Sequence, residues 1–287
     1  MRILITGGRG LLGSEITKTF DSHGFDTVSI GTKEADITKR NEINRIIPFY
    51  KPEVIIHAAA YTFVDECERN KELAFRVNAV GTQNVAEAAE LIGAALVYMS
   101  TDYVFDGNAA SPYTEEDVPN PLNVYGASKL EGERLAAGAS SRCCIIRSSW
   151  LFGKNGRNFV DTMREQLHRG NDRVLTVVND QRGSPTYAVH LADALLQVVN
   201  NVTGESPAPP GIFHITASGE CTWYEFARRI AELLGMQVDI LPVSSGDFRR
   251  DATRPNYSVL DNSKAQRLFG ITMPHWEDGL KEYIGLK

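Results

Sequence analysis

The chain has 287 residues, of which 43% are hydrophobic, and carries a formal net charge of −6. This composition supplies a large core, and the negative charge argues against nucleic acid or an acidic membrane surface as a partner. No apolar run approaches membrane-spanning length, and the start "MRILITGG" is too short for a signal peptide. The four cysteines form no C-x-x-C pair and no zinc pattern. We therefore expect a cytoplasmic protein with reduced thiols and no metal.

Apolar runs alternate with amphipathic stretches through the first half of the chain. Strands are predicted over 2–6, 26–31, 53–60, 95–102 and 142–150, and helices over 11–21, 38–50, 70–92 and 123–138. Thr38 is the expected N-cap of the second helix. Continuous apolar strands that alternate with helices are typical of a parallel sheet covered on both faces. The sequence therefore predicts an α/β fold with a Rossmann-type, doubly wound parallel sheet.

The alternation becomes less regular after about residue 150. A strand is predicted over 211–216, and a helix over 221–235 with Thr222 as its N-cap. We expect residues 1–150 to form a dinucleotide-binding domain to which later segments contribute. Residues 151–287 would form mainly a smaller, partly interleaved C-terminal substrate domain.

The stretch "LITGGRGLLGSE", residues 4–15, joins the first strand to the first helix. Gly8, Gly10 and Gly13 spell G-x-G-x-x-G, whereas Gly7, Gly10 and Gly13 spell G-x-x-G-x-x-G. Strand, glycines and helix in this order are the context that the dinucleotide fingerprint requires. The helix N-terminus offers free N–H groups to a pyrophosphate, and Gly13 would let the helix pack closely on the strand.

The end of the second strand bears on the choice of cofactor. An acidic residue there holds the adenosine ribose hydroxyls and favours NAD. Here the strand ends Gly31-Thr32-Lys33, and Glu34 comes late. Lys33 and Arg9 are placed to meet a 2′-phosphate, which favours NADPH, with NADH as a possible substitute. The alternative is that both are solvated surface cations.

A catalytic set is indicated by "YMSTDYVFDG" (98–107) and "NVYGASKLEGE" (123–133). Tyr125 and Lys129 are four residues apart on a predicted helix, so their side chains share one face. Thr101 lies at the carboxyl end of a strand, where open α/β sheets hold their active sites. We expect the Lys129 ammonium to lower the pKa of Tyr125, which could then act as acid or base. Thr101 would hydrogen-bond a substrate oxygen.

This combination resembles the extended short-chain dehydrogenase/reductase family, and the likeness covers essentially the whole chain. It includes "HAAAYTFVDECE" (57–68), "RSSWLFG" (147–153), "NDQRGSPTYAVHLADAL" (179–195) and "RPNYSVLDNSK" (254–264). The segments after residue 147 are the specific ones, and they resemble the branch of the family that reduces dTDP-linked 4-keto sugars. The Tyr125–Lys129 pair selects Gly7, Gly10 and Gly13, which leaves Gly8 as a flexible neighbour that lets the loop approach the pyrophosphate.

The resemblance implies reduction of a dTDP-6-deoxy-4-keto-hexose, dTDP-4-dehydro-L-rhamnose, to dTDP-L-rhamnose. NAD(P)H would supply the hydride and Tyr125 the proton, in a monomer or homodimer. Implied cofactor contacts are Gly7, Gly10, Leu11, Leu12, Asp36, Ile37, Ala58, Ala59, Ala60, Tyr125 and Lys129. Implied substrate contacts are Thr101, Asp102, Tyr103 and Trp150. The nucleotide diphosphate needs cations, for which Arg249, Arg250 and Arg254 are candidates.

Two other functions stay open at this point. A dehydratase of the same family would place an acid-acid pair after Thr101, but Asp102 is followed by Tyr103; an epimerase is not excluded. The regulatory subunit of methionine adenosyltransferase is similar to this family and acts by binding a partner. An intact Thr101–Tyr125–Lys129 set permits catalysis without proving it.

Overall fold

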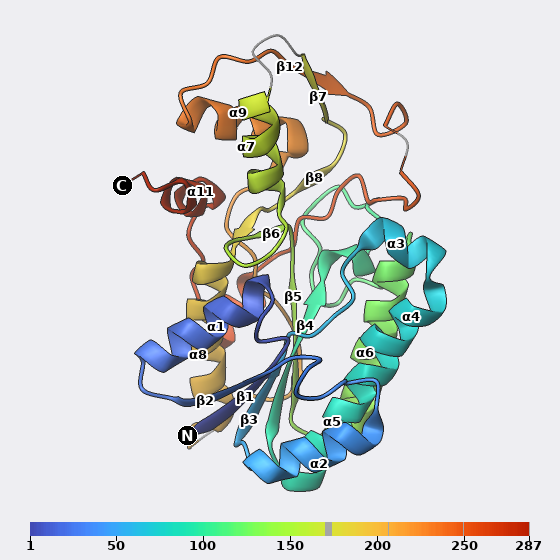
Figure 1. Ribbon diagram of the computed structural model, residues 1–287, viewed down its shortest axis with the longest axis vertical. Helices are drawn as coiled ribbons and strands as arrows, with labels where there is room; N and C mark the ends of the chain where they lie inside the picture. Colours follow the sequence, from blue (N-terminus) through green and yellow to red (C-terminus); the bar gives the residue numbers. More distant parts are fainter. Residues whose placement is uncertain (170–173, 206, 249, 287) are drawn as a thin grey trace.

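The computed structural model describes residues 1–169, 174–205, 207–248 and 250–286. Six parallel strands form the central sheet in the order β10-β5-β4-β3-β1-β2 (Figure 1). They are β1 (Arg2–Thr6), β2 (Asp26–Ile30), β3 (Val54–His57), β4 (Ala95–Thr101), β5 (Cys143–Ser148) and β10 (Gly211–His214). The chain order reverses beside β1, as in Rossmann-type sheets. The predicted fold class is confirmed.

Helices cover both faces of the sheet (Figure 1). On one face lie α1 (Leu11–Ser22) and α8 (Ala188–Thr203); on the other lie α2 (Arg40–Tyr50), α5 (Thr82–Ile92) and α6 (Val124–Ala139). Successive side chains of a strand point to opposite faces. Ile3 and Ile5 of β1 therefore enter one hydrophobic core, and Leu4 enters the other. This two-sided burial explains why the strands are apolar throughout.

The helical region before α5 is more broken than the sequence suggests. The expected helix over 70–92 is divided into α4 (Lys71–Phe75), a π-helical segment η1 (Arg76–Gly81) and α5. A shorter helix, α3 (Val64–Arg69), precedes them. The buried Asn78 in η1 holds the loop after β3, because its carboxamide bonds the backbone N–H and C=O of Tyr61. π-helical turns are frequent at functional sites.

The rest of the second half forms a smaller layer beyond the sheet (Figure 1). It contains α7 (Phe159–Arg169), α9 (Trp223–Leu233), α11 (Trp276–Ile284) and the parallel pair β7 (Leu175–Val178) and β12 (Ile240–Val243). Short strand pairs join β6 (Leu151–Phe152) to β9 (Thr186–Tyr187) and β8 (Arg182–Gly183) to β11 (Cys221–Thr222). The helix α10 (Ser263–Phe269) packs against β10 of the central sheet and against α8.

Two predicted helix caps have different outcomes. Thr222 caps α9 in a reciprocal capping box with Glu225, as expected. Thr38 does not cap α2; the helix begins at Arg40, and Thr38 donates to Asp36 through its backbone N–H and its hydroxyl. Within the described ranges, no helix is both long and apolar enough to cross a membrane.

Candidate active site

A cavity of about 580 Å³ lies at the carboxyl ends of the sheet strands, between the glycine loop, α6 and the smaller layer. This is the edge at which open α/β sheets bind ligands. Most of the residues singled out from the sequence share its lining. These are Gly7, Arg9, Gly10, Leu11, Leu12, Gly13, Asp36, Ile37, Ala58, Ala59, Ala60, Thr101, Asp102, Tyr103, Tyr125, Lys129 and Trp150.

The glycine loop leaves no room for side chains where it passes the sheet. Gly7 has a φ of +70°, and a Cβ on it would lie 2.7 Å from the backbone N of Ala59. A Cβ on Gly13 would lie 2.2 Å from the Gly7 carbonyl oxygen. Gly10 is the N-cap of α1, and among the described residues no side chain caps this end. The first amides of α1 therefore face the cavity free of side-chain caps, which fits a pyrophosphate.

The structure requires glycine at position 8 for a different reason from the one expected. A Cβ on Gly8 would lie 2.6 Å from the Ser29 Cβ, and the Gly8 N–H donates to Ile30 O at 3.2 Å. Gly8 is thus held against β2, and the expectation of a flexible neighbour is wrong. Gly7 and Gly13 are the positions where close backbone approach shapes the loop.

Arg9 and Glu34 meet at the end of β2. Arg9 donates to the Glu34 carboxylate, which also accepts the Gly31 N–H at 2.8 Å. That backbone hydrogen bond, with the Arg9 charge, lowers the pKa of Glu34. Glu34 therefore reaches back to the strand end, where the sequence suggested no acid. Lys33 is exposed and stays outside the lining of the cavity.

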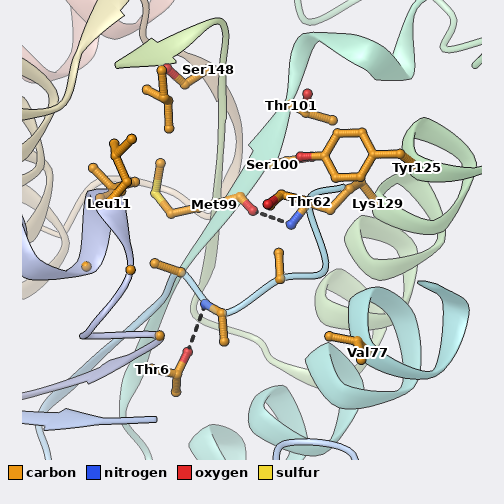
Figure 2. A pocket seen from close by; sticks show the side chains of 18 of the residues that line it. Thr6, Leu11, Thr62, Val77, Met99, Ser100, Thr101, Tyr125, Lys129 and Ser148 are labelled. Carbon is orange, nitrogen blue, oxygen red and sulfur yellow. Dashed lines mark hydrogen bonds between the residues drawn. The ribbon is translucent and has the colours of Figure 1, made fainter. Parts of the chain in front are cut away.

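The Tyr125–Lys129 pair projects from α6 toward the end of β4 (Figure 2). Asn123 caps this helix by accepting the Gly126 N–H at 2.8 Å. The buried Lys129 ammonium donates to the Met99 carbonyl at 2.6 Å and lies 4.3 Å from the centre of the Tyr98 ring. The Lys129 side chain is therefore fixed in the cavity wall by the protein itself.

Burial dominates the electrostatics of this pair. It lowers the pKa of Lys129 to about 7, against the opposing effect of Glu133. It raises the pKa of Tyr125 above the ordinary value, although the Thr101 hydroxyl opposes the shift. The expectation that Lys129 lowers the pKa of Tyr125 is wrong, because the effect of burial exceeds it. Tyr125 consequently keeps its proton at neutral pH, which is the state that a proton donor needs.

Asp102 links the end of β4 to the segment 254–264. Its buried carboxylate accepts hydrogen bonds from Thr101 Oγ1 at 3.0 Å and from Ser258 Oγ at 2.6 Å. Burial raises the pKa of Asp102 to about 7, although these two hydrogen bonds oppose the shift. The neighbouring Tyr103 has its pKa raised to about 12, chiefly by burial. Thr101 is thereby oriented by Asp102, and Asp102 is held in turn by Ser258 from far along the sequence.

Trp150 forms part of the opposite wall. Its indole stacks on that of Trp223, with ring centroids 3.5 Å apart and an angle of 2° between the planes. Trp150 has a φ of +46°, which is uncommon for a bulky residue. Gly183 makes room for the indole, because a Cβ there would lie 2.5 Å from it. Such strained residues cluster at ligand sites.

The arginine candidates lie apart from this cavity. Arg254 is 8% exposed and donates to both carboxylate oxygens of Asp65, at 3.1 and 2.7 Å. It lines a second cavity of about 310 Å³ together with Arg250. Both arginines oppose the rise in the pKa of Tyr103, so they lie within electrostatic range of a residue that lines the first cavity. Arg249 lies outside the described residues.

Comparison with known proteins places the chain in a family. The family described as RmlD substrate binding domain matches residues 1–286. The chain belongs to this family. It is 40% identical to a dTDP-4-dehydrorhamnose reductase of Aggregatibacter actinomycetemcomitans, over 98% of this chain and 97% of that protein. It is 36% identical to the spore coat polysaccharide biosynthesis protein SpsK of Bacillus subtilis, over 99% of this chain and 96% of that protein.

The fold of this RmlD-family chain closely follows a solved structure. A crystal structure of dTDP-4-dehydrorhamnose reductase from Bacillus anthracis in complex with NADP superposes with a TM-score of 0.93. It is 39% identical and covers 99% of this chain and 98% of that one. The expected family resemblance is confirmed, and the chain is grouped with NAD(P)-dependent sugar-nucleotide reductases.

Several lining residues of this family member escape sequence reasoning. Trp223 looks like a core residue of the smaller layer, because it opens an amphipathic helix. Arg157 follows β6 in an exposed loop and brings a further cation to the cavity. Ser148 and Ser149 line it from the end of β5. Strand ends predict the two serines, but no periodicity identifies Trp223 or Arg157 as part of the site.

Proposed function

We propose that this chain reduces the 4-keto group of dTDP-4-dehydro-L-rhamnose to give dTDP-L-rhamnose, with NADPH as the preferred hydride donor. The convergence of Thr101, Tyr125 and Lys129 on the cavity that the glycine loop opens into carries the proposal. Relatives named dTDP-4-dehydrorhamnose reductases, aligned over nearly the full length, support the choice of substrate.

The roles of the residues follow from their chemistry. NADPH supplies a hydride to C4 of the sugar when it is bound. Tyr125 gives its hydroxyl proton to the C4 oxygen. The Thr101 hydroxyl, which donates to Asp102, turns to donate its hydrogen bond to that oxygen instead. The Lys129 ammonium stabilises the phenolate that remains on Tyr125 and binds the nicotinamide ribose. The ketone thus gains one hydride and one proton, and solvent returns the proton to Tyr125.

The remaining contacts are assigned by position. The α1 amides, with Gly7, Gly10, Leu11 and Leu12, bind the cofactor pyrophosphate. Asp36 and Ile37 would hold the adenine, and Ala58–Ala60 would lie beneath the cofactor. Asp102, Tyr103 and Trp150 contact the sugar, with residues 151–287 forming most of the substrate domain. Arg249 and Arg254 are proposed to bind the diphosphate of the substrate. The charge of Arg254 is largely neutralised by Asp65, so Arg250 is the less neutralised cation of the second cavity.

The test is a coupled assay with a panel of nucleotide 4-keto sugars, in which NADPH and NADH oxidation are followed separately. We expect stoichiometric NADPH oxidation with dTDP-4-dehydro-L-rhamnose and formation of dTDP-L-rhamnose. Tightly retained NAD with no net consumption of NADPH would instead identify an epimerase or dehydratase and contradict the proposal.

A second substrate is supported by the similarity to SpsK, which is close to that of the reductase relatives. In this case the chain would reduce a different dTDP-linked 4-keto sugar with the same residues. The panel separates the two, because kcat/KM for the true substrate should exceed that for every other 4-keto sugar.

A further inference from the structure

A buried ion pair lies behind the catalytic residues, and the proposed mechanism does not use it. Glu133 of α6 and Arg147 of β5 have side chains only 3% and 1% exposed. Arg147 donates two hydrogen bonds to the carboxylate, from Nε at 2.9 Å and from a terminal nitrogen at 2.6 Å. The Ser100 hydroxyl, whose residue lines the cavity, donates to the same carboxylate.

The pair is built into the frame that carries the catalytic residues. Tyr125, Lys129 and Glu133 are four residues apart along α6, so they lie on successive turns of one side of the helix. Lys129 donates to the Met99 carbonyl, and Glu133 accepts from Ser100. Two successive turns of α6 thus hold two consecutive residues of β4. Replacing Glu133 would release the second of these contacts directly beside Lys129.

The pair also sets the charge around Lys129. The Lys129 ammonium lies over the Tyr98 ring and acts on His57, and Glu133 acts on Lys129 in turn. Tyr125 lies one turn before Lys129 on the same side of α6, and Arg147 is paired with Glu133. His57 is neutral, since burial and the Lys129 charge lower its pKa to about 3. Among the described residues, Glu133 is the group that opposes the effect of burial on Lys129. Buried ion pairs add little net stability in general, so stability alone is a weak reason for this one.

We propose that Glu133 is a positioning residue of the reductase site: it fixes Ser100 beside the catalytic helix and holds a negative charge one helical turn from the Lys129 ammonium. Arg147 balances the carboxylate and orients it through the two-pronged contact. The link to catalysis rests on the proposed function. The effect on Lys129 itself is a property of the folded chain and is independent of the substrate.

The first experiment is a pH profile of kcat/KM for Glu133→Gln, which keeps the size of the side chain and removes its charge. Reduction requires protonated Lys129, so activity falls as pH rises through its pKa. Loss of a buried charge one helical turn away should move this basic limb down by about one to two pH units. Activity should recover at lower pH. Glu131→Gln, on the same helix but paired with Arg134 at the surface, should leave the profile unchanged.

The second experiment tests the proposal even if the single variant Glu133→Gln fails to fold. Glu133→Gln combined with Arg147→Met removes both charges and leaves no unpaired guanidinium. The downward shift should persist in the double variant at a similar size, because Glu133 and not Arg147 perturbs the pKa of Lys129. A double variant with the wild-type limb would show that the pair only supports the fold, and would overturn the proposal.

The titration of Lys129 can be read without any substrate. NMR of the protein with ¹³C-labelled lysine, assigned with Lys129→Arg, reports the midpoint of this ammonium. We expect a lower midpoint in Glu133→Gln and in the double variant, and the wild-type value in Glu131→Gln. Absence of wild-type turnover would refute the proposed function alone. An unchanged Lys129 midpoint in both Glu133 variants would refute the role of Glu133.

Discussion

Arg9 and Glu34 offer the sharpest test of cofactor choice. Their ion pair sits beside Gly31 at the end of β2, and Arg9 also lines the cavity. The two side chains are 60% and 30% exposed, so the pair contributes little to stability and can open for a ligand. A 2′-phosphate here would be attracted by Arg9 and repelled by Glu34. A ribose 2′-hydroxyl would instead donate to Glu34. Substitutions at the two positions should therefore shift cofactor preference in opposite directions.

The size of each effect follows from the exposure of the pair. Loss of a hydrogen bond between charged groups weakens binding by about 10-fold to 100-fold. The effect for an exposed arginine lies at the lower end of this range, because solvent screens its charge. Arg9→Ala should lower kcat/KM for NADPH by about tenfold and change that for NADH by less than about twofold. Glu34→Gln should raise kcat/KM for NADPH by about threefold and lower that for NADH.

The assay is steady-state oxidation of each cofactor at saturating sugar nucleotide, with Lys33→Ala as the matched control. Lys33 is an exposed cation of the same turn that does not line the cavity, so its loss should leave the NADPH to NADH ratio unchanged. Equal losses for both cofactors in Arg9→Ala would refute the placement of Arg9 at the 2′-phosphate. If Lys33→Ala changed the NADPH to NADH ratio as much as Arg9→Ala does, the effect of Arg9 would be explained by general surface charge.

Three further substitutions, one of them with a matched control, test the site and its frame. Tyr125→Phe should lower kcat by at least about 100-fold with an unchanged Kd for NADPH, since only the proton donor is lost; near wild-type turnover would contradict the mechanism. Gly13→Ala should lower Tm and weaken NADPH binding, because its Cβ would lie 2.2 Å from the Gly7 oxygen, whereas Gly138→Ala, with open space around it, should stabilise α6 by about 0.5 to 1 kcal/mol. Equal Tm values for the two would refute the packing argument. His57→Gln should make the free energy of unfolding fall less steeply as the pH is lowered. The pKa of His57 is about 3 in the folded protein and about 6.5 in the unfolded chain, so below pH 6.5 a proton binds the unfolded chain more tightly. The contribution of His57 to stability is therefore full above pH 6.5, and about 3 kcal/mol of it is lost by pH 4. Parallel pH curves of unfolding free energy for the variant and the wild type would exclude His57 as the titrating group.

The elements and the main site could be predicted because their causes are local. β1 runs over Arg2–Thr6 as expected, because a short apolar run followed by glycines predicts a buried strand that ends in a turn. Tyr125 and Lys129 lie on one face of α6 because four residues make about one helical turn. The position of Thr101 at the cavity follows from its place at a strand end.

The residues that sequence reasoning misplaced depend on the path of the chain between elements. Glu34 comes three residues after Gly31, yet the turn folds its carboxylate back onto the Gly31 N–H. Trp223 begins an amphipathic helix, and only the tertiary fold stacks it on Trp150. Arg254 looks like a free cation in the sequence, but Asp65, far away along the chain, neutralises it. Such long-range pairings leave no periodic pattern to detect.

The pKa of Tyr125 shows how burial bears on the direction of the reaction. Tyrosine with lysine one turn later suggests a phenolate, but burial raises the pKa of Tyr125 and lowers that of Lys129 to about 7. The site therefore holds its proton on Tyr125 rather than exposing a base. Arrival of a hydride at the sugar carbonyl creates the negative charge that draws this proton away, and Lys129 then faces the phenolate. Oxidation of the alcohol would need that phenolate at the outset, so this arrangement suits ketone reduction better than the reverse reaction.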